Sequence, residues 1–101
     1  MPNLLARAKF AVPVERPAVA ADWAGRGYSC EPFTDPPGRE WLDFVHDTDE
    51  LVTVIEGRLE IVVGTEALIA EAGDEVFIPR RVTHSVKNLH AGTTRWLYGY
   101  N

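Results

Sequence analysis

Three side chains of the kinds that bind metal ions stand in two short stretches of the sequence, at His46, Glu50 and His84. The first stretch places a histidine and a glutamate four residues apart, just before an apolar run that Gly57 ends. Two imidazoles and one carboxylate suit Fe(II), Mn(II), Ni(II) or Zn(II), and they leave coordination positions open. The sequence therefore predicts a site for a divalent transition metal, with the identity of the metal left open.

Acidic residues gather around His46 in the sequence, and their field attracts cations. Asp47 and Asp49 are interpreted as parts of a solvated turn rather than as ligands. A buried Glu50 beside two histidines needs a compensating charge, and a cation supplies it most simply. The alternative left open is that these side chains pack and hydrogen-bond without a metal.

Short strands and turns account for most of the chain after residue 27. β-Branched and aromatic runs alternate with turn signals at intervals of roughly ten residues, which is typical of a sandwich or barrel. Glu56-Gly57-Arg58 is predicted to join two strands as a tight hairpin. Eight or nine strands are expected, the clearest at 28–34, 41–46, 51–56, 59–63, 67–70, 76–78, 84–89 and 95–100.

The first 27 residues have a different character. We interpret 1–3 as a loose start and 4–14 as a strand or arm, while 17–24 predicts one short helix. Pro17 suits a first helical turn, and Gly25 and Gly27 end the pattern. We expect a single domain over 1–101, with the arm and helix at about 1–27 and a barrel at about 28–101.

Strand alternation assigns faces to the aromatic residues. In 41–46, Phe44 and His46 share the inward face and Trp41 lies on the other. In 95–100, Trp96 shares its face with two tyrosines, while the opposite face carries Leu97. Such a strand is either covered on both sides or meets a partner chain. We expect Trp41 and Trp96 to lie outside the lumen and to form a homodimer interface.

Composition narrows the classes of partner. The chain has 101 residues, a net charge of -5 and a pI near 5.1. A nucleic-acid-binding protein needs a basic stripe, so we expect no nucleic-acid partner. No uncharged apolar run is long enough to span a bilayer, and no signal peptide is evident, so we expect no membrane partner and a cytoplasmic location.

The single cysteine, Cys30, excludes an internal disulfide and thiolate zinc sites. No histidine or asparagine stands at a recognisable spacing to activate it, so Cys30 is interpreted as a small hydrophobic residue. His90 is expected in an exposed turn, without a role.

The spacing of the candidate ligands resembles the two motifs of the cupin family. The first motif reads Gly, five residues, His-x-His, three or four residues, Glu, six residues, Gly, and its matches are Gly38, His46, Glu50 and Gly57. The second reads Gly, five residues, Pro-x-Gly, two residues, His, three residues, Asn, and its matches are Gly73, Pro79, His84 and Asn88. The chain is identified by this resemblance as a small single-domain cupin.

The resemblance implies an all-β fold, the cupin double-stranded β-helix or jelly-roll barrel, here with a short N-terminal helix. It also implies that His46, Glu50 and His84 bind the metal. Cupin sites of this kind serve dioxygenases, isomerases and decarboxylases that act on small molecules. No catalytic residue beyond the ligands can be named, and the reaction stays open.

Two positions depart from the family pattern. Phe44 stands where the first motif has its first histidine, and Arg81 stands where the second has glycine. The loss of one imidazole leaves three ligands and predicts weaker metal binding or an extra water ligand. Arg81 costs up to about 1 to 2 kcal/mol if its φ is positive.

Apolar residues predicted to face the lumen form a candidate substrate-binding wall, at Phe44, Val52, Val54 and Val86. A cavity with a few polar groups suits a small-molecule ligand, although in so small a barrel the same residues could fill the core. Three functions follow: a metal-dependent enzyme, a ligand-binding or sensing module without metal, and a structural dimer with a filled barrel.

Overall fold

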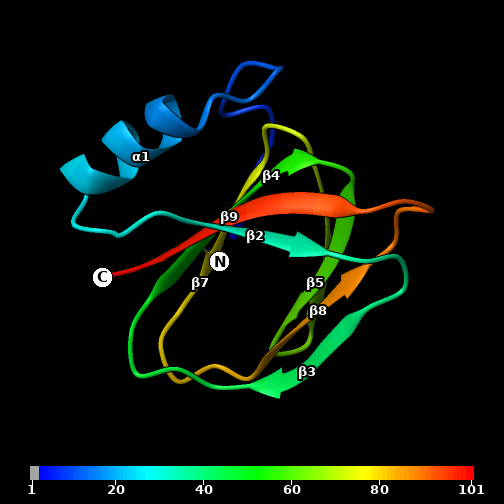
Figure 1. Ribbon diagram of the computed structural model, residues 1–101. Helices are drawn as coiled ribbons and strands as arrows, with labels where there is room; N and C mark the ends of the chain where they lie inside the picture. Colours follow the sequence, from blue (N-terminus) through cyan, green and yellow to red (C-terminus); the bar gives the residue numbers. More distant parts are fainter. Residues whose placement is uncertain (1–2) are drawn as a thin grey trace.

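The computed structural model describes residues 3–101, so the loose start predicted at Met1 and Pro2 lies outside the described residues. The strands are β1 (Leu5–Ala6), β2 (Glu31–Asp35), β3 (Glu40–Phe44), β4 (Glu50–Glu56), β5 (Arg58–Val63), β6 (Glu66–Glu71), β7 (Glu75–Ile78), β8 (His84–Asn88) and β9 (Thr94–Tyr100). They form two antiparallel sheets that face each other, ordered β1-β7-β4-β9-β2 and β3-β8-β5-β6 (Figure 1). The predicted all-β jelly-roll is confirmed.

The main core lies between the two sheets. Because side chains alternate along a strand, Val52 and Val54 of β4 point toward the four-stranded sheet. There they join a buried cluster with Ile61 of β5 and Trp96 of β9. The cluster extends along the barrel as far as Ile78, which lies opposite Glu50.

The single helix of the described chain, α1 (Arg16–Gly25), covers the outer face of the five-stranded sheet (Figure 1). Val19 and Trp23, one turn apart, are fully buried and pack in a second cluster with Leu51 and Leu97. No helix within residues 3–101 is long and apolar enough to cross a membrane. The helix therefore gives β4 and β9 a covered outer face, which explains why Leu97 is apolar.

The predicted hairpin at Glu56-Gly57-Arg58 is wrong, because β4 and β5 do not pair. β4 pairs with β7 and β9, whereas β5 pairs with β6 and β8 in the other sheet. Gly57 has a φ of 107°, and a β-carbon there would overlap the side chain of Thr94. Only glycine tolerates this conformation and this close approach. The chain crosses from one sheet to the other at Gly57.

A β-bulge in β3 changes the faces predicted for residues 41–46. Trp41 lies opposite Val86 and Phe44 opposite His84, so Leu42 and Asp43 together face a single residue of β8. Asp43 has a φ of 58°, and its N–H donates to Ser85 Oγ at 3.1 Å. The extra residue turns Trp41 and Phe44 to the same side of the strand.

Asn88 ties the end of β8 to the end of β2. Its amide nitrogen donates to the carbonyl oxygens of Asp35, Pro36 and Gly92, and its Oδ1 accepts a 2.6 Å hydrogen bond from the Thr94 hydroxyl. The side chain is buried, so these bonds satisfy polar groups that water does not reach. Asn88 holds the turns at this end of the barrel.

Candidate metal centre

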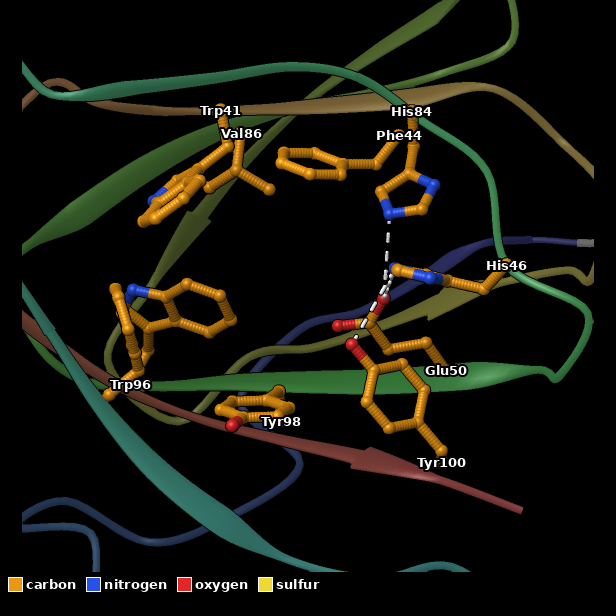
Figure 2. A pocket seen from close by; sticks show the side chains of 10 residues that line it. Trp41, Phe44, His46, Glu50, His84, Val86, Trp96, Tyr98 and Tyr100 are labelled. Carbon is orange, nitrogen blue, oxygen red and sulfur yellow. Dashed lines mark hydrogen bonds and ion pairs between the residues drawn. The ribbon is translucent and has the colours of Figure 1, made fainter.

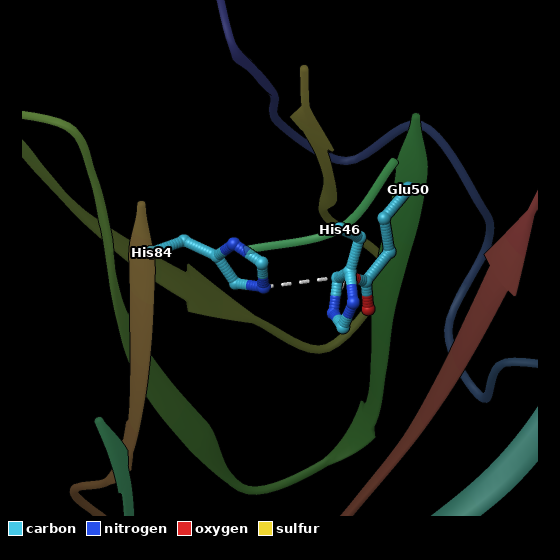
Figure 3. A group of neighbouring side chains, drawn as sticks. All are labelled: His46, Glu50 and His84. Carbon is cyan, nitrogen blue, oxygen red and sulfur yellow. Dashed lines mark ion pairs between the residues drawn. The ribbon is translucent and has the colours of Figure 1, made fainter. Parts of the chain in front are cut away.

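The three predicted ligands meet at one end of the barrel. His46, Glu50 and His84 each offer one ligand atom, and these atoms all lie within 4.8 Å of one another (Figure 3). Glu50 Oε1 lies 3.6 Å from His46 Nε2 and 3.5 Å from His84 Nε2. One oxygen and two ring nitrogens thus converge, an arrangement that suits a single cation.

Different elements hold the three side chains. Glu50 begins β4 and pairs with Ile78 of β7 and Tyr100 of β9, so its backbone is fixed on both sides. His84 begins β8 in the opposite sheet. His46 lies in the loop between β3 and β4, outside a strand, and its side chain is 32% exposed. The site therefore has two rigid members and one on a loop.

Arg81 anchors the loop that carries His46. Its N–H donates to the His46 carbonyl oxygen at 2.7 Å. The φ of Arg81 is 61°, so the left-handed conformation considered from the sequence is present at this position. It costs about 1 to 2 kcal/mol relative to glycine. Arg81, in the second motif, thus fixes the position of His46, a candidate ligand in the first motif.

The polar atoms at the centre fit a metal. Glu50 Oε1 is buried and has no hydrogen-bond partner among the described residues. His84 Nδ1 lies 3.2 Å from the Val82 carbonyl oxygen, which can only accept, so this contact places a proton on Nδ1. In neutral His84, the lone pair of Nε2 then faces the unpartnered oxygen of Glu50. A cation shared by both atoms, or a second proton on His84, removes this repulsion.

Two pKa values reflect the burial and charge of the site. Burial alone lowers the pKa of His84, but the interaction with Glu50 and the hydrogen bond to Val82 outweigh it and raise the pKa. Burial, with a smaller effect of the Glu50 charge, raises the pKa of Tyr100 to about 12. The Tyr100 hydroxyl lies 3.5 Å from His46 Nε2 and keeps its proton at neutral pH. It is a fixed O–H group beside the ligands.

A cavity of about 180 Å³ opens beside the three ligands (Figure 2). Its walls are mostly aromatic, and the residues that line it are Phe33, Trp41, Phe44, His46, Glu50, His84, Val86, Trp96, Tyr98 and Tyr100. Of the predicted substrate-binding residues, Phe44 and Val86 line this cavity. Val52 and Val54 do not, because they lie deeper, in the packed core. The barrel is thus partly filled and partly open.

The predicted outward placement of Trp41 and Trp96 is wrong, since both line the cavity. The bulge turns Trp41 inward, and α1 covers the other face of β9, which leaves the Trp96 face to the lumen. The aromatic rings therefore do not form the outer interface that suggested a homodimer. The period of two did group Trp96 with Tyr98 and Tyr100, but it could not tell which face was inside.

Asp35, which sequence reasoning missed, supports both tryptophans. Its Oδ1 accepts the indole N–H of Trp41 at 3.0 Å, and its Oδ2 accepts that of Trp96 at 2.8 Å. The carboxylate is fully buried, and Arg39 Nε lies 3.8 Å from it. Asp35 stands in a sequence typical of a turn, so only the contacts identify it. Asp35 thus connects Trp41, in the four-stranded sheet, with Trp96, in the five-stranded sheet.

We expect Asp35→Asn to lower the free energy of unfolding by about 2 to 3 kcal/mol. The amide has one acceptor oxygen where the carboxylate has two, so it turns an N–H₂ group toward one of the indole N–H groups. Urea denaturation measures the change. Glu31→Gln, an exposed carboxylate on the same strand, is the matched control and is expected to stay within about 0.5 kcal/mol of the wild type. Equal effects of both substitutions would contradict the role of Asp35.

Comparison with known proteins adds one family match. The family model described as a cupin domain matches residues 33–100, which include both motifs from His46 to Asn88. A search of curated proteins finds no match.

Several solved structures share the fold at low sequence identity. An RmlC-like cupin from Shewanella frigidimarina is 19% identical with a TM-score of 0.66 over 72% of this chain and 64% of that chain. A cupin 2 domain-containing protein from Halorhodospira halophila is 20% identical, with a TM-score of 0.69 over 73% and 52%. A salicylate 1,2-dioxygenase variant from Pseudoaminobacter salicylatoxidans is 20% identical, with a TM-score of 0.66 over 72% and 21%. This protein thus spans less than two thirds of the length of each of these three proteins. At this level of identity the similarity shows a shared fold and nothing more.

Proposed function

The chain belongs to the cupin family, and from this premise we propose that it binds a divalent transition metal and acts on a small molecule beside it. The ligands are His46, Glu50 and His84. The observation that carries the proposal is the buried Glu50 Oε1, which has no hydrogen-bond partner within residues 3–101 and lies within 3.6 Å of both histidine Nε2 atoms. A buried carboxylate without a partner is costly, and a cation stabilises it.

The reaction class is the range already associated with such cupins: dioxygenase, isomerase or decarboxylase. A metal at such a site supplies Lewis acidity toward an oxygen of the substrate, or activates dioxygen. The chain's own groups act around it. The aromatic walls give the cavity a largely apolar surface, and the Tyr100 hydroxyl, which stays protonated, offers a hydrogen-bond donor beside His46.

A second candidate is a ligand-binding or sensing module that uses no metal. Phe44 favours it, because this ring lies where the family has a histidine ligand. The ring is nearly parallel to that of His46, with centroids 6.3 Å apart, and its centroid lies 6.2 Å from that of His84. In this alternative the pocket binds an apolar compound and the three polar side chains serve only to orient it.

Elemental analysis of the protein purified without chelator separates the two candidates. The metal proposal expects close to one iron, manganese, nickel or zinc per chain, either as purified or after reconstitution. Metal far below this level under both conditions would contradict it and favour the metal-free module. The homodimer and the cytoplasmic location stay predictions, and sedimentation of the same sample tests the first.

We expect Phe44→His to strengthen metal binding by about tenfold or more. The substitution adds an imidazole beside His46 and His84, and even groups that only orient ligands change metal affinity by 10- to 100-fold. Competition with a chromophoric chelator measures the affinity. Phe44→Leu, which removes the ring without adding a ligand, is the control and should leave the affinity within about threefold of the wild type. If both variants bind equally, position 44 does not face the metal.

A further inference from the structure

The cavity beside the ligands has two chemically different ends. His46, Glu50 and His84 lie at one end, and Trp41, Trp96 and Val86 lie at the other, with open space between them (Figure 2). Phe44 and Tyr98 form the walls in the middle. A molecule in this cavity therefore meets the three candidate ligands at one end, and mostly aromatic surface over the rest of its length.

The volume of the cavity limits what it can hold. It measures about 180 Å³. A protein cavity of roughly 150 Å³ holds one benzene molecule. The space here suits a single six-membered ring with one short substituent, and a larger ligand would extend through the open side of the cavity.

The shape of the walls favours a flat ring. Phe33 contacts Trp41, Trp96 and Tyr98 edge to face, with centroid distances of 5.5, 5.4 and 6.4 Å. Asp35 holds both indoles through their N–H groups, so the ring planes are fixed before a ligand enters. Aromatic pairs prefer offset and edge-to-face contacts, and such fixed walls offer them to a planar ligand.

The charges in the cavity exclude other classes of ligand. Among the described residues, none of those lining the cavity is lysine or arginine, so a phosphate or a dicarboxylate finds no cationic side chain. A cationic ligand is disfavoured at the tryptophan end, because the Arg39 guanidinium already lies 4.0 Å from the Trp41 ring centroid and 3.8 Å from the Asp35 carboxylate, and it repels a second cation. What remains is a neutral compound, or one whose single negative charge lies at the metal end.

We propose that the substrate class is a single-ring aromatic compound with an oxygen donor on the ring or one atom away from it. The ring lies between Trp41, Trp96 and Tyr98, and the oxygen points toward His46, Glu50 and His84. This inference rests on the proposed function in one respect, since the metal is what receives the oxygen. The aromatic site itself does not depend on the metal.

A matched pair of hydroxamic acids tests the inference. Acetohydroxamic and benzohydroxamic acid carry the same metal-binding group and differ by a methyl against a phenyl. In protein loaded with Co(II), titrations followed by tryptophan fluorescence should give at least about tenfold tighter binding of the phenyl compound, after correction for free Co(II). Cyclohexanecarbohydroxamic acid should bind more weakly than the phenyl compound. Equal binding of the phenyl and methyl compounds, or of the phenyl and cyclohexyl compounds, overturns the inference.

Two variants locate the effect. Val86→Phe fills the tryptophan end of the cavity, and Tyr98→Leu removes one aromatic wall. Each should abolish the preference for phenyl while acetohydroxamic acid binds within about twofold of its wild-type affinity. Circular dichroism checks the fold of each, and either variant alone suffices if the other does not fold. A phenyl preference that survives in a folded variant places the ring elsewhere and overturns the inference.

The failure of the metal proposal gives a different result. A protein that takes up no Co(II) binds neither hydroxamic acid through its metal-binding group, and the proposed function fails. Benzyl alcohol titrated into the metal-free protein then tests the ring site alone. Saturable quenching of tryptophan fluorescence that Val86→Phe removes supports the aromatic site, and the absence of quenching overturns it.

Discussion

Glu50→Gln is expected to remove stoichiometric metal from the protein and to weaken metal affinity by at least about 100-fold. Glutamine has nearly the same size as glutamate, but it lacks the negative charge that offsets a metal cation held between the two histidines. Glu50 supplies the only carboxylate in the ligand cluster of the described chain. Its side chain is 6% exposed, so solvent does little to stabilise a metal cation that has lost this negative charge. Elemental analysis and titration with Zn(II) measure the loss.

Asp47→Asn is the matched control for this prediction. Asp47 lies in the same loop as His46, but its side chain is 90% exposed and its ion pair with Arg81 is long at 3.8 Å. Its removal should leave the metal content unchanged, as its interpretation as part of a solvated turn requires. Retention of metal in Glu50→Gln together with its loss in Asp47→Asn would place the site in the loop and contradict the proposed ligand set.

Glu75→Ala is expected to lower the free energy of unfolding by about 3 kcal/mol, which lowers Tm by more than about 10 °C in a domain of this size. Glu75 is buried under α1, where it accepts the indole N–H of Trp23 at 2.8 Å. Arg26 Nη2 lies 2.6 Å and Lys9 Nζ 3.3 Å from its carboxylate. Hydrogen bonding to Glu75 is also the main cause that raises the pKa of Arg26. The substitution leaves a buried indole N–H unpaired and removes the charge that joins the helix and arm to the sheet.

Asp22→Ala controls for the loss of a carboxylate beside Arg26. Asp22 pairs with Arg26 on the helix surface, where an ion pair contributes about 0.5 kcal/mol or less. Glu75→Gln should fall between the two, because it keeps an acceptor for Trp23 without the charge. Thermal denaturation of the three variants tests the order. A Glu75→Ala protein as stable as Asp22→Ala would show that α1 is held by its apolar side chains alone.

Much of the fold was predictable from local pattern. Pro17 and the glycines after residue 24 bounded the helix to within one residue of Arg16–Gly25. The strand rhythm located the strands of the barrel because turn signals separate short segments of strand-forming residues. The family motifs brought His46, Glu50 and His84 together, and the structure places their ligand atoms within 4.8 Å. Spacing along the chain was sufficient for these features.

The aromatic cavity was not predictable in the same way. A period of two assigns residues to opposite faces, but the bulge at Asp43 breaks that period and turns Trp41 inward. The role of Asp35 depends on two indoles that are six and 61 residues away along the chain. Neither contact leaves a trace in local composition.

The sequence by itself determined the fold class, the ligand types and the approximate positions of the strands along the chain, because these follow from residue pattern and from spacing within short segments. Only the tertiary structure decided which face of each strand is inside and where the barrel stays open. The physical reason is that α1 covers one side of β4 and β9, so the apolar residues of both faces find partners. Val52 and Val54 then fill the core, while the rings of Trp41 and Trp96, held by Asp35, leave a cavity beside Glu50.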